Sequence, residues 1–198
     1  GSTGSITLNG NITQGVGGAG SEGVVFTGPV ILGSEKSITI TTDGGGTDGD
    51  VTFSGSASTI SGVNGGSAEN LTIDSGTGAV SIQGIIGGTS GTKLGSLTIN
   101  STDGSGETGA ITLTGIGTAS VEGTTTTTVG NANTSSLTLA GTNYKTGGTT
   151  IYEADGTGND IRITGASPTI DSSGNALTFD NANILLNNSA DGTTTLST

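Results

Sequence analysis

The sequence contains no cysteine, histidine, methionine or tryptophan, and it has few positive charges. Without histidine or cysteine, the chain cannot carry a nucleophile activated by a histidine base. Only 4 Lys+Arg stand against 16 Asp+Glu, which gives a formal net charge of −12. Such a surface repels the phosphates of nucleic acids, so we expect no nucleic-acid partner. No apolar run reaches the ~18 residues of a membrane span, so we also expect no membrane insertion.

The residues that are abundant indicate an ordered, all-β chain. The 198 residues include 40 glycines and many serines and threonines, yet 29% are hydrophobic and only 3% are aromatic. The apolar residues come in short, regular clusters of Ile, Leu and Val, which a disordered linker would not need. Few aromatics favour a thin core of stacked aliphatic side chains. Because even an initiator methionine is lacking, we expect a processed chain or part of a longer one.

Internal repetition is the strongest signal in the sequence. Short apolar–polar–apolar segments, each typical of a strand with one buried face, fall into two columns. The first column contains residues 37–40, 70–73, 96–99, 136–139 and 176–179. The second contains residues 6–10, 51–55, 80–84, 111–115 and 161–165. A looser third set follows the second, at residues 30–32, 85–86 and 168–170.

Two architectures could use such strands, an antiparallel sandwich and a solenoid. A solenoid stacks each segment on its equivalent in the next coil, so that like residues meet. The first column would then form an inward ladder of Leu and Ile and an outward ladder of Thr39, Thr72, Thr98, Thr138 and Thr178. We therefore predict a right-handed parallel β-helix of about five to six three-sided coils. It would be a single domain over residues 1–198, with a surface insertion at 141–160.

No amphipathic capping segment is recognisable at either end of the sequence. The first and last apolar segments, residues 6–8 and 184–186, resemble those of the interior coils. Open end rungs offer unpaired backbone groups and apolar side chains. We therefore expect the chain to stack axially on itself or to adjoin further repeats.

At these columns the sequence resembles the repeats of large bacterial surface adhesins of the filamentous-haemagglutinin and autotransporter-passenger type. Residues 28–34, which lead into Ser37–Ile40, resemble the β-strand repeats of giant exoproteins of aquatic bacteria. Residues 137–151, with adjacent Asn143 and Tyr144 before a Gly pair and Thr-x-Ile, resemble the passenger-associated repeat, although Lys145 departs from its spacing. The resemblance implies an exported, extracellular or cell-surface stalk with no cofactor and no catalytic residue.

Three functions can be considered for these residues: polysaccharide processing, calcium binding and ice binding. Parallel β-helices include polysaccharide-processing enzymes, but the single arginine, Arg162, is accompanied only by Asp160 in sequence, so we expect no catalytic site. Asp43, Asp48 and Asp50 supply oxygen ligands in a glycine-rich run and form a weak calcium candidate. Their spacing matches neither an EF-hand nor a β-roll repeat. Thr-x-Thr pairs such as Thr39/Thr41 and Thr112/Thr114 raise an ice-binding alternative, against ordinary β-propensity.

The segment 141–160 holds both tyrosines and departs from the regular pattern. Tyr144, Lys145 and Tyr152 form a candidate contact patch for surface glycans or for host or cell-surface proteins. The alternative is that both tyrosines anchor the segment onto the coil. The sequence thus predicts a structural or adhesive rod, with a carbohydrate- or ice-binding module as the alternative and a polysaccharide-processing β-helix as a remoter one.

Overall fold

A computed structural model describes residues 4–14, 22–44, 48–63, 68–100, 109–155, 160–187 and 192–198. These residues form β-strands joined by turns, and none of them is helical. Accordingly, no described segment is a helix with the length and apolar character that crossing a membrane requires.

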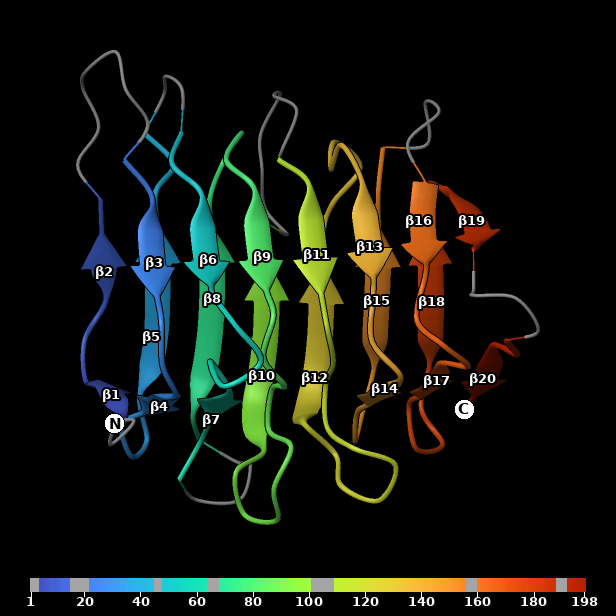
Figure 1. The fold of residues 1–198 in the computed structure, drawn as a ribbon, viewed down its shortest axis with the longest axis horizontal. Coiled ribbons are helices and arrows are strands. Elements are labelled where there is room, and N and C mark those ends of the chain that lie inside the picture. Colours follow the sequence, from blue (N-terminus) through green and yellow to red (C-terminus); the bar gives the residue numbers. More distant parts are fainter. Residues whose placement is uncertain are drawn as a thin grey trace.

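The strands stack in parallel on three sides of a solenoid (Figure 1). We call the two seven-stranded sides sheet I and sheet II, and the remaining side the third side. Sheet I contains β2 (Ile12–Thr13), β5 (Ser37–Thr41), β8 (Asn70–Asp74), β10 (Leu94–Ile99), β12 (Thr124–Val129), β15 (Thr150–Glu153) and β18 (Leu177–Asp180). Sheet II contains β3 (Val24–Phe26), β6 (Val51–Phe53), β9 (Val80–Ile82), β11 (Ile111–Leu113), β13 (Leu137–Leu139), β16 (Asp160–Ile163) and β19 (Asn183–Leu186).

The third side is narrower and is continuous only through single-residue bridges at its centre. Its strands are β1 (Ile6–Leu8), β4 (Val30–Leu32), β7 (Ile60–Ser61), β14 (Asn143–Lys145), β17 (Thr169–Asp171) and β20 (Thr195–Ser197). Parallel bridges from Ile60 to Ile86, from Ile86 to Ile116 and from Ile116 to Tyr144 join its two halves. The chain visits the third side, sheet I and sheet II in turn.

The winding is right-handed. In Figure 1 the chain descends through sheet II at the front, crosses the third side and rises through sheet I at the back as it moves from the N-terminal to the C-terminal end. Each coil therefore advances by one rung of parallel hydrogen bonds. The prediction of an all-β parallel solenoid of about six coils is confirmed.

The core is a set of aliphatic ladders along the axis. In sheet I, Ile38, Leu71 and Leu97 stack in register, and Ile40, Ile73 and Ile99 form the next row. All six are buried, while Thr39, Thr72 and Thr98 between them point outward. The alternation read from the sequence therefore gave the correct inward and outward faces for these strands.

Two segments belong to other sides than predicted. Residues 136–139 were assigned to the first column, but β13 pairs with β11 and β16 in sheet II. Thr138 therefore lies between Thr112 and Arg162, outside the threonine ladder of sheet I. Residues 6–8 were assigned to the second column, but β1 pairs with β4 on the third side. Both errors arose because a pattern of two aliphatic residues around a threonine occurs on all three sides, as Ile-Thr-Leu in β1, Ile-Thr-Ile in β5 and Ile-Thr-Leu in β11.

A layer of buried threonines explains why two sheet I strands were not recognised. Thr127 and Thr150 occupy the inward ladder position that continues from Leu97 and leads to Leu177. Thr127 pairs with Thr124 at 2.7 Å between hydroxyl oxygens, and Thr150 pairs with Thr146 at 2.5 Å. These contacts satisfy hydroxyls that would otherwise be costly to bury. The strands therefore lack the apolar alternation on which the sequence prediction depended.

The segment 141–160 is not a surface insertion in its described part, residues 141–155 and 160. Strand β14 pairs with β17, and β15 pairs with both β12 and β18. The chain reaches sheet I quickly here because Thr150 follows Tyr144 by only 6 positions. Residues 156–159 lie outside the described residues. The segment thus supplies regular rungs, and the insertion prediction is corrected.

Glycine is required where successive sheet II corners meet. A Cβ on Gly141 would lie 1.4 Å from the carbonyl oxygen of Thr114, and one on Gly165 would lie 1.9 Å from that of Gly141. Side chains at these positions would separate the coils. Glycine is therefore a condition for stacking at these two corners, whereas a Cβ on Gly55 would meet no atom within 4 Å.

Candidate functional site

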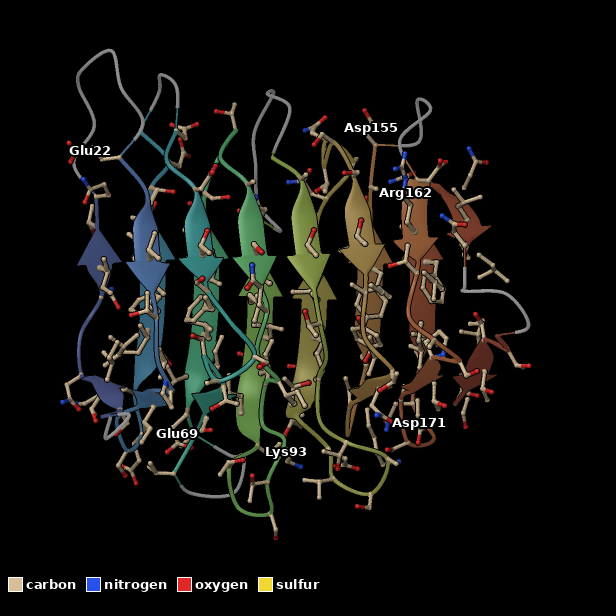
Figure 2. The ribbon with its side chains drawn as sticks, viewed as in Figure 1. Glu22, Glu69, Lys93, Asp155, Arg162 and Asp171 are labelled. Atoms are coloured by element: carbon tan, nitrogen blue, oxygen red, sulfur yellow. The ribbon has the colours of Figure 1, made fainter. Side chains whose placement is uncertain are left out.

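All three lysines and four described acidic residues, Glu35, Glu69, Glu122 and Asp171, lie on one edge of the rod, and nine described acidic residues lie on the opposite edge. Acidic residues follow the corner that links sheet I to sheet II, and we call this corner the acidic edge. Figure 2 shows Glu22 and Asp155 at this edge, with Arg162 close by. Its described members are Glu22, Asp43, Asp48, Asp50, Asp74, Glu153, Asp155, Asp160 and Asp180. All three lysines lie instead at the corner between the third side and sheet I, which we call the lysine edge.

The calcium candidate lies on the acidic edge, where two of its carboxylates bind the neighbouring coil. The Asp48 carboxylate accepts hydrogen bonds from the backbone N–H of Thr77 at 2.9 Å and from its hydroxyl at 2.9 Å. Asp50 accepts one from the backbone N–H of Ala79 at 2.8 Å. Among the described residues, no three Asp, Glu, His or Cys side chains form a group able to hold a metal ion. Residues 45–47 of this run lie outside the described residues.

Asp74 lies partly buried near other carboxylates of the acidic edge. Burial raises the pKa of its carboxyl above the ordinary value, and the nearby charges of Asp43 and Asp48 raise it further, against a hydrogen bond from the backbone of Gly76. The crowding of carboxylates therefore opposes ionisation here.

Two similar loops project from the lysine edge. Residues 87–93 and 117–123 each follow an isoleucine, Ile86 and Ile116, and each begins with a glycine of positive φ, Gly87 at 62° and Gly117 at 66°. In Figure 1 they extend below the rod between β9 and β10 and between β11 and β12.

A threonine closes each of these loops. In the first, Thr92 N–H donates to the Thr89 carbonyl at 3.0 Å and Thr89 N–H donates to the Thr92 hydroxyl at 3.1 Å. In the second the direction is reversed, because Thr118 N–H donates to the Val121 carbonyl at 2.8 Å and Val121 N–H donates to the Thr118 hydroxyl at 3.2 Å. The two loops stack as neighbours, and Ser90 and Ser120 are exposed on them.

An open groove of about 300 Å³ lies against these loops. Ser90 and Lys93 line it from the first loop, Ser120 and Glu122 from the second, and Lys145 from β14. Lys93 donates to the Glu122 carboxylate at 3.0 Å. Lys145 donates to Asp171 of the following coil. The two ion pairs thus each connect adjacent coils, and Lys93, Glu122 and Lys145 from these pairs line the groove.

The ion pairs set the charge states of the groove. The pKa of Glu122 is lowered, chiefly by the hydrogen bond from Lys93, with a further contribution from the charge of Lys145. The pKa of Asp171 is lowered, chiefly by the hydrogen bond from Lys145. Both carboxylates are therefore ionised at neutral pH, and both lysines meet a formed negative charge.

Of the three residues of the predicted contact patch, Tyr144 and Tyr152 are buried and Lys145 lines the groove. Tyr144 and Tyr152 have exposed fractions of 0%, so neither ring can meet a partner, and the prediction of an aromatic patch is wrong. The Tyr144 hydroxyl donates to the carbonyl of Leu113 and accepts from the N–H of Gly141, both at 2.7 Å. The Tyr152 ring stacks on Phe179, with ring centroids 5.6 Å apart. The tyrosines fill the core, and Lys145 alone reaches the surface groove.

The groove was not recognised in the sequence, although a signal for it exists. Leu97 follows Ile86 by 11 positions and Thr127 follows Ile116 by 11, and both intervals contain Ile-Gly-x-x-Ser. Equal, enlarged corners in successive coils indicate stacked loops on one edge. The partners of Lys93 and Lys145 could not be read in the same way, because each lies a full coil away.

The C-terminal end of the described rod exposes the inward face of its last coil. Ile184 and Leu186 follow the buried Ile161 and Ile163 in register, and Leu196 follows the buried Ile170. Ile184 is nevertheless 43% exposed, Leu186 58% and Leu196 53%. These three side chains form an apolar surface that we call the end face.

Asp160 and Arg162 both lie on β16. Arg162 is exposed and points outward from β16, between Thr138 and Leu185.

No family model matches the chain, and neither a curated protein nor a solved structure matches it.

Proposed function

We propose that this chain is a structural and adhesive segment of a secreted bacterial cell-surface or extracellular fibre protein. It would act as a rigid β-helical rod that stacks end to end or adjoins further repeats. The observation that carries the proposal is the end face, where the ladder positions of the core are presented to solvent. The resemblance of residues 28–40 and 137–151 to adhesin and passenger repeats supports the cellular setting, and possible targets are surface glycans or host proteins.

The end face favours an axial partner because it continues an interaction already made throughout the rod. Every interior coil covers the equivalents of Ile184, Leu186 and Leu196 with the next coil, and this burial contributes about 25 cal/mol per Å² of apolar surface. The last rungs also offer unpaired backbone N–H and C=O groups. The two ends of the rod are different surfaces, so their contact is heterologous and propagates as a filament.

Two variants of β19 separate axial stacking from other association. Ile184 and Leu185 are both 43% exposed, but Ile184 lies on the inward ladder and Leu185 on the outer surface of sheet II. We expect Ile184→Asp to abolish filaments, because it places a charge in the contact. Leu185→Asp serves as the matched control and should leave them intact.

Electron microscopy and sedimentation across a range of concentrations measure this difference. Filaments in the wild type and in Leu185→Asp but not in Ile184→Asp would support the proposal. Equal assembly of both variants, or a monodisperse wild-type monomer at every concentration, would contradict end-to-end stacking.

Ice binding is a second candidate because sheet I carries a row of outward threonines. Thr39, Thr72, Thr98 and Thr128 occupy equivalent positions in four successive strands, which are spaced ~4.8 Å apart. Ile151 interrupts the row in β15. A measurement of thermal hysteresis tests this candidate, which requires activity in the wild type and its loss in Thr98→Lys.

A further inference from the structure

The groove on the lysine edge lies at a step in the outline of the rod. The two coils that carry loops 87–93 and 117–123 are followed by one whose corner is short, since only 6 positions separate Tyr144 from Thr150. Lys145 in this coil is adjacent to the second loop, because its carbonyl accepts from Gly123 N–H at 2.9 Å and its own N–H donates to Ile116 at 2.7 Å. The loops therefore wall one side of the groove. Enlarged corners on one face of a solenoid are frequent binding surfaces.

The groove is lined by two lysines, although positively charged residues are scarce in this chain. Lys93 and Lys145 are two of only 4 Lys+Arg in a chain of net charge −12. Figure 2 places Lys93 and Asp171 on the edge opposite Glu22 and Asp155, away from the acidic edge. An anionic ligand would therefore meet less repulsion here than beside the crowded carboxylates of the acidic edge.

The donors and acceptors define the ligand. Each ammonium group has three N–H donors and one carboxylate partner among the contacts above, so both can also bind an anionic oxygen. The exposed Ser90 and Ser120 hydroxyls and the Glu122 carboxylate suit the hydroxyl groups of a sugar. No aromatic side chain lines the groove, so the stacking that commonly holds neutral sugars is missing. The groove thus combines cations for a carboxylate with polar groups for a sugar ring.

We propose that this groove binds a carboxylate-bearing sugar unit of an acidic polysaccharide. The carboxylate lies between the ammonium groups of Lys93 and Lys145, and the ring hydroxyls face Ser90, Ser120 and Glu122. A single groove gives weak binding, and copies aligned in a stack would raise the avidity. This last point rests on the proposed adhesive rod, but binding itself does not, because all the lining residues belong to one chain.

Titration of the 198-residue chain with trigalacturonate, followed by NMR and calorimetry, tests the assignment. The fully methyl-esterified trisaccharide is the matched ligand control, since it removes only the charge. We expect saturable binding of the acid, with shifts at loops 87–93 and 117–123, and at least about tenfold weaker binding of the ester. The same measurement on Ile184→Asp keeps the result independent of assembly.

Variants assign the binding to the groove. Lys93→Gln and Lys145→Gln should each weaken trigalacturonate binding about tenfold or more, whereas Lys36→Gln, an exposed lysine outside the groove, should not. Ser120→Phe obstructs the groove and leaves both ion pairs in place, so it should also prevent binding, and melting curves check that each variant is folded. The proposal is overturned by equal affinity for acid and ester, by a sulfated neutral trisaccharide binding as well as the acid, by unchanged binding in the lysine variants, or by no saturation up to about 10 mM.

Discussion

At the scale of single residues, the two buried tyrosines differ in one respect that can be measured. Burial raises the pKa of both hydroxyls, so both stay protonated. The Tyr144 hydroxyl has two backbone partners, whereas the buried Tyr152 hydroxyl has no partner among the described residues. Both side chains are fully buried in the core, so loss of either ring would be costly.

We therefore predict opposite results for two removals of a hydroxyl. Tyr144→Phe leaves the N–H of Gly141 without its acceptor and should lower the free energy of unfolding by about 1–3 kcal/mol. Tyr152→Phe removes an unpaired buried hydroxyl and should be neutral or stabilising. Urea unfolding of both variants decides, and a larger loss in Tyr152→Phe than in Tyr144→Phe would contradict the hydrogen bonding described here.

The register of sheet I can be tested on adjacent residues of β10. Leu97 is buried in the ladder, and Thr98 points outward. Leu97→Asp should destabilise by several kcal/mol, because it buries an unpaired charge. Thr98→Asp should change stability by less than about 1 kcal/mol. Thermal or urea unfolding that shows equal damage in the two variants would refute the assigned register.

At the scale of strands and corners, the sequence predicted the strands and their buried faces better than it predicted the contacts on the lysine edge. Alternation identified the inward positions of β5, β8 and β10, because the isoleucine and leucine side chains there alternate with polar ones and are apolar enough to favour burial. Alternation failed at β12 and β15, where pairs of threonines replace the apolar ladder. The β-propensity of threonine does not show which face of a strand is buried. Alternation also failed for the tyrosines, which are fully buried on inward positions of β14 and β15. The groove depends on the contact between Lys93 and Glu122, which lie one coil apart. This contact depends on the shapes of the two loops, which the local residue pattern does not predict.

Two acidic corner residues should respond to pH in opposite ways. The folded-state pKa of Asp171 is lowered, so its contribution to stability is present above the unfolded value and is lost as the pH falls through the folded one. The folded-state pKa of Asp74 is raised, so ionisation of Asp74 costs stability once the pH exceeds the unfolded value.

At pH 7 we therefore expect Asp171→Asn to lower the free energy of unfolding by about 0.2–1 kcal/mol and Asp74→Asn to raise it. Both differences should be smaller near pH 2, because the carboxyls become protonated as the pH falls. Unfolding curves at the two pH values measure them, and a shift of the same sign in both variants at pH 7 would contradict the assignment.

At the scale of the whole molecule, stability should come from stacked coils and not from a bound metal. The carboxylates of Asp48 and Asp50 already accept hydrogen bonds from the next coil. Millimolar calcium should therefore change the melting temperature by less than about 5 °C, as should magnesium. A larger rise with calcium alone would make the run from Asp43 to Asp50 a ligand site.

The central claim is that copies of this rod continue one another along the solenoid axis. X-ray diffraction from aligned filaments tests it most directly, because the strands of a solenoid lie across its axis. We predict a sharp reflection at ~4.8 Å along the filament axis, because the strand spacing would continue across the contact between copies. Filaments whose ~4.8 Å reflection lies across the axis would show that the rods associate side by side, and the account of end-to-end stacking would be wrong.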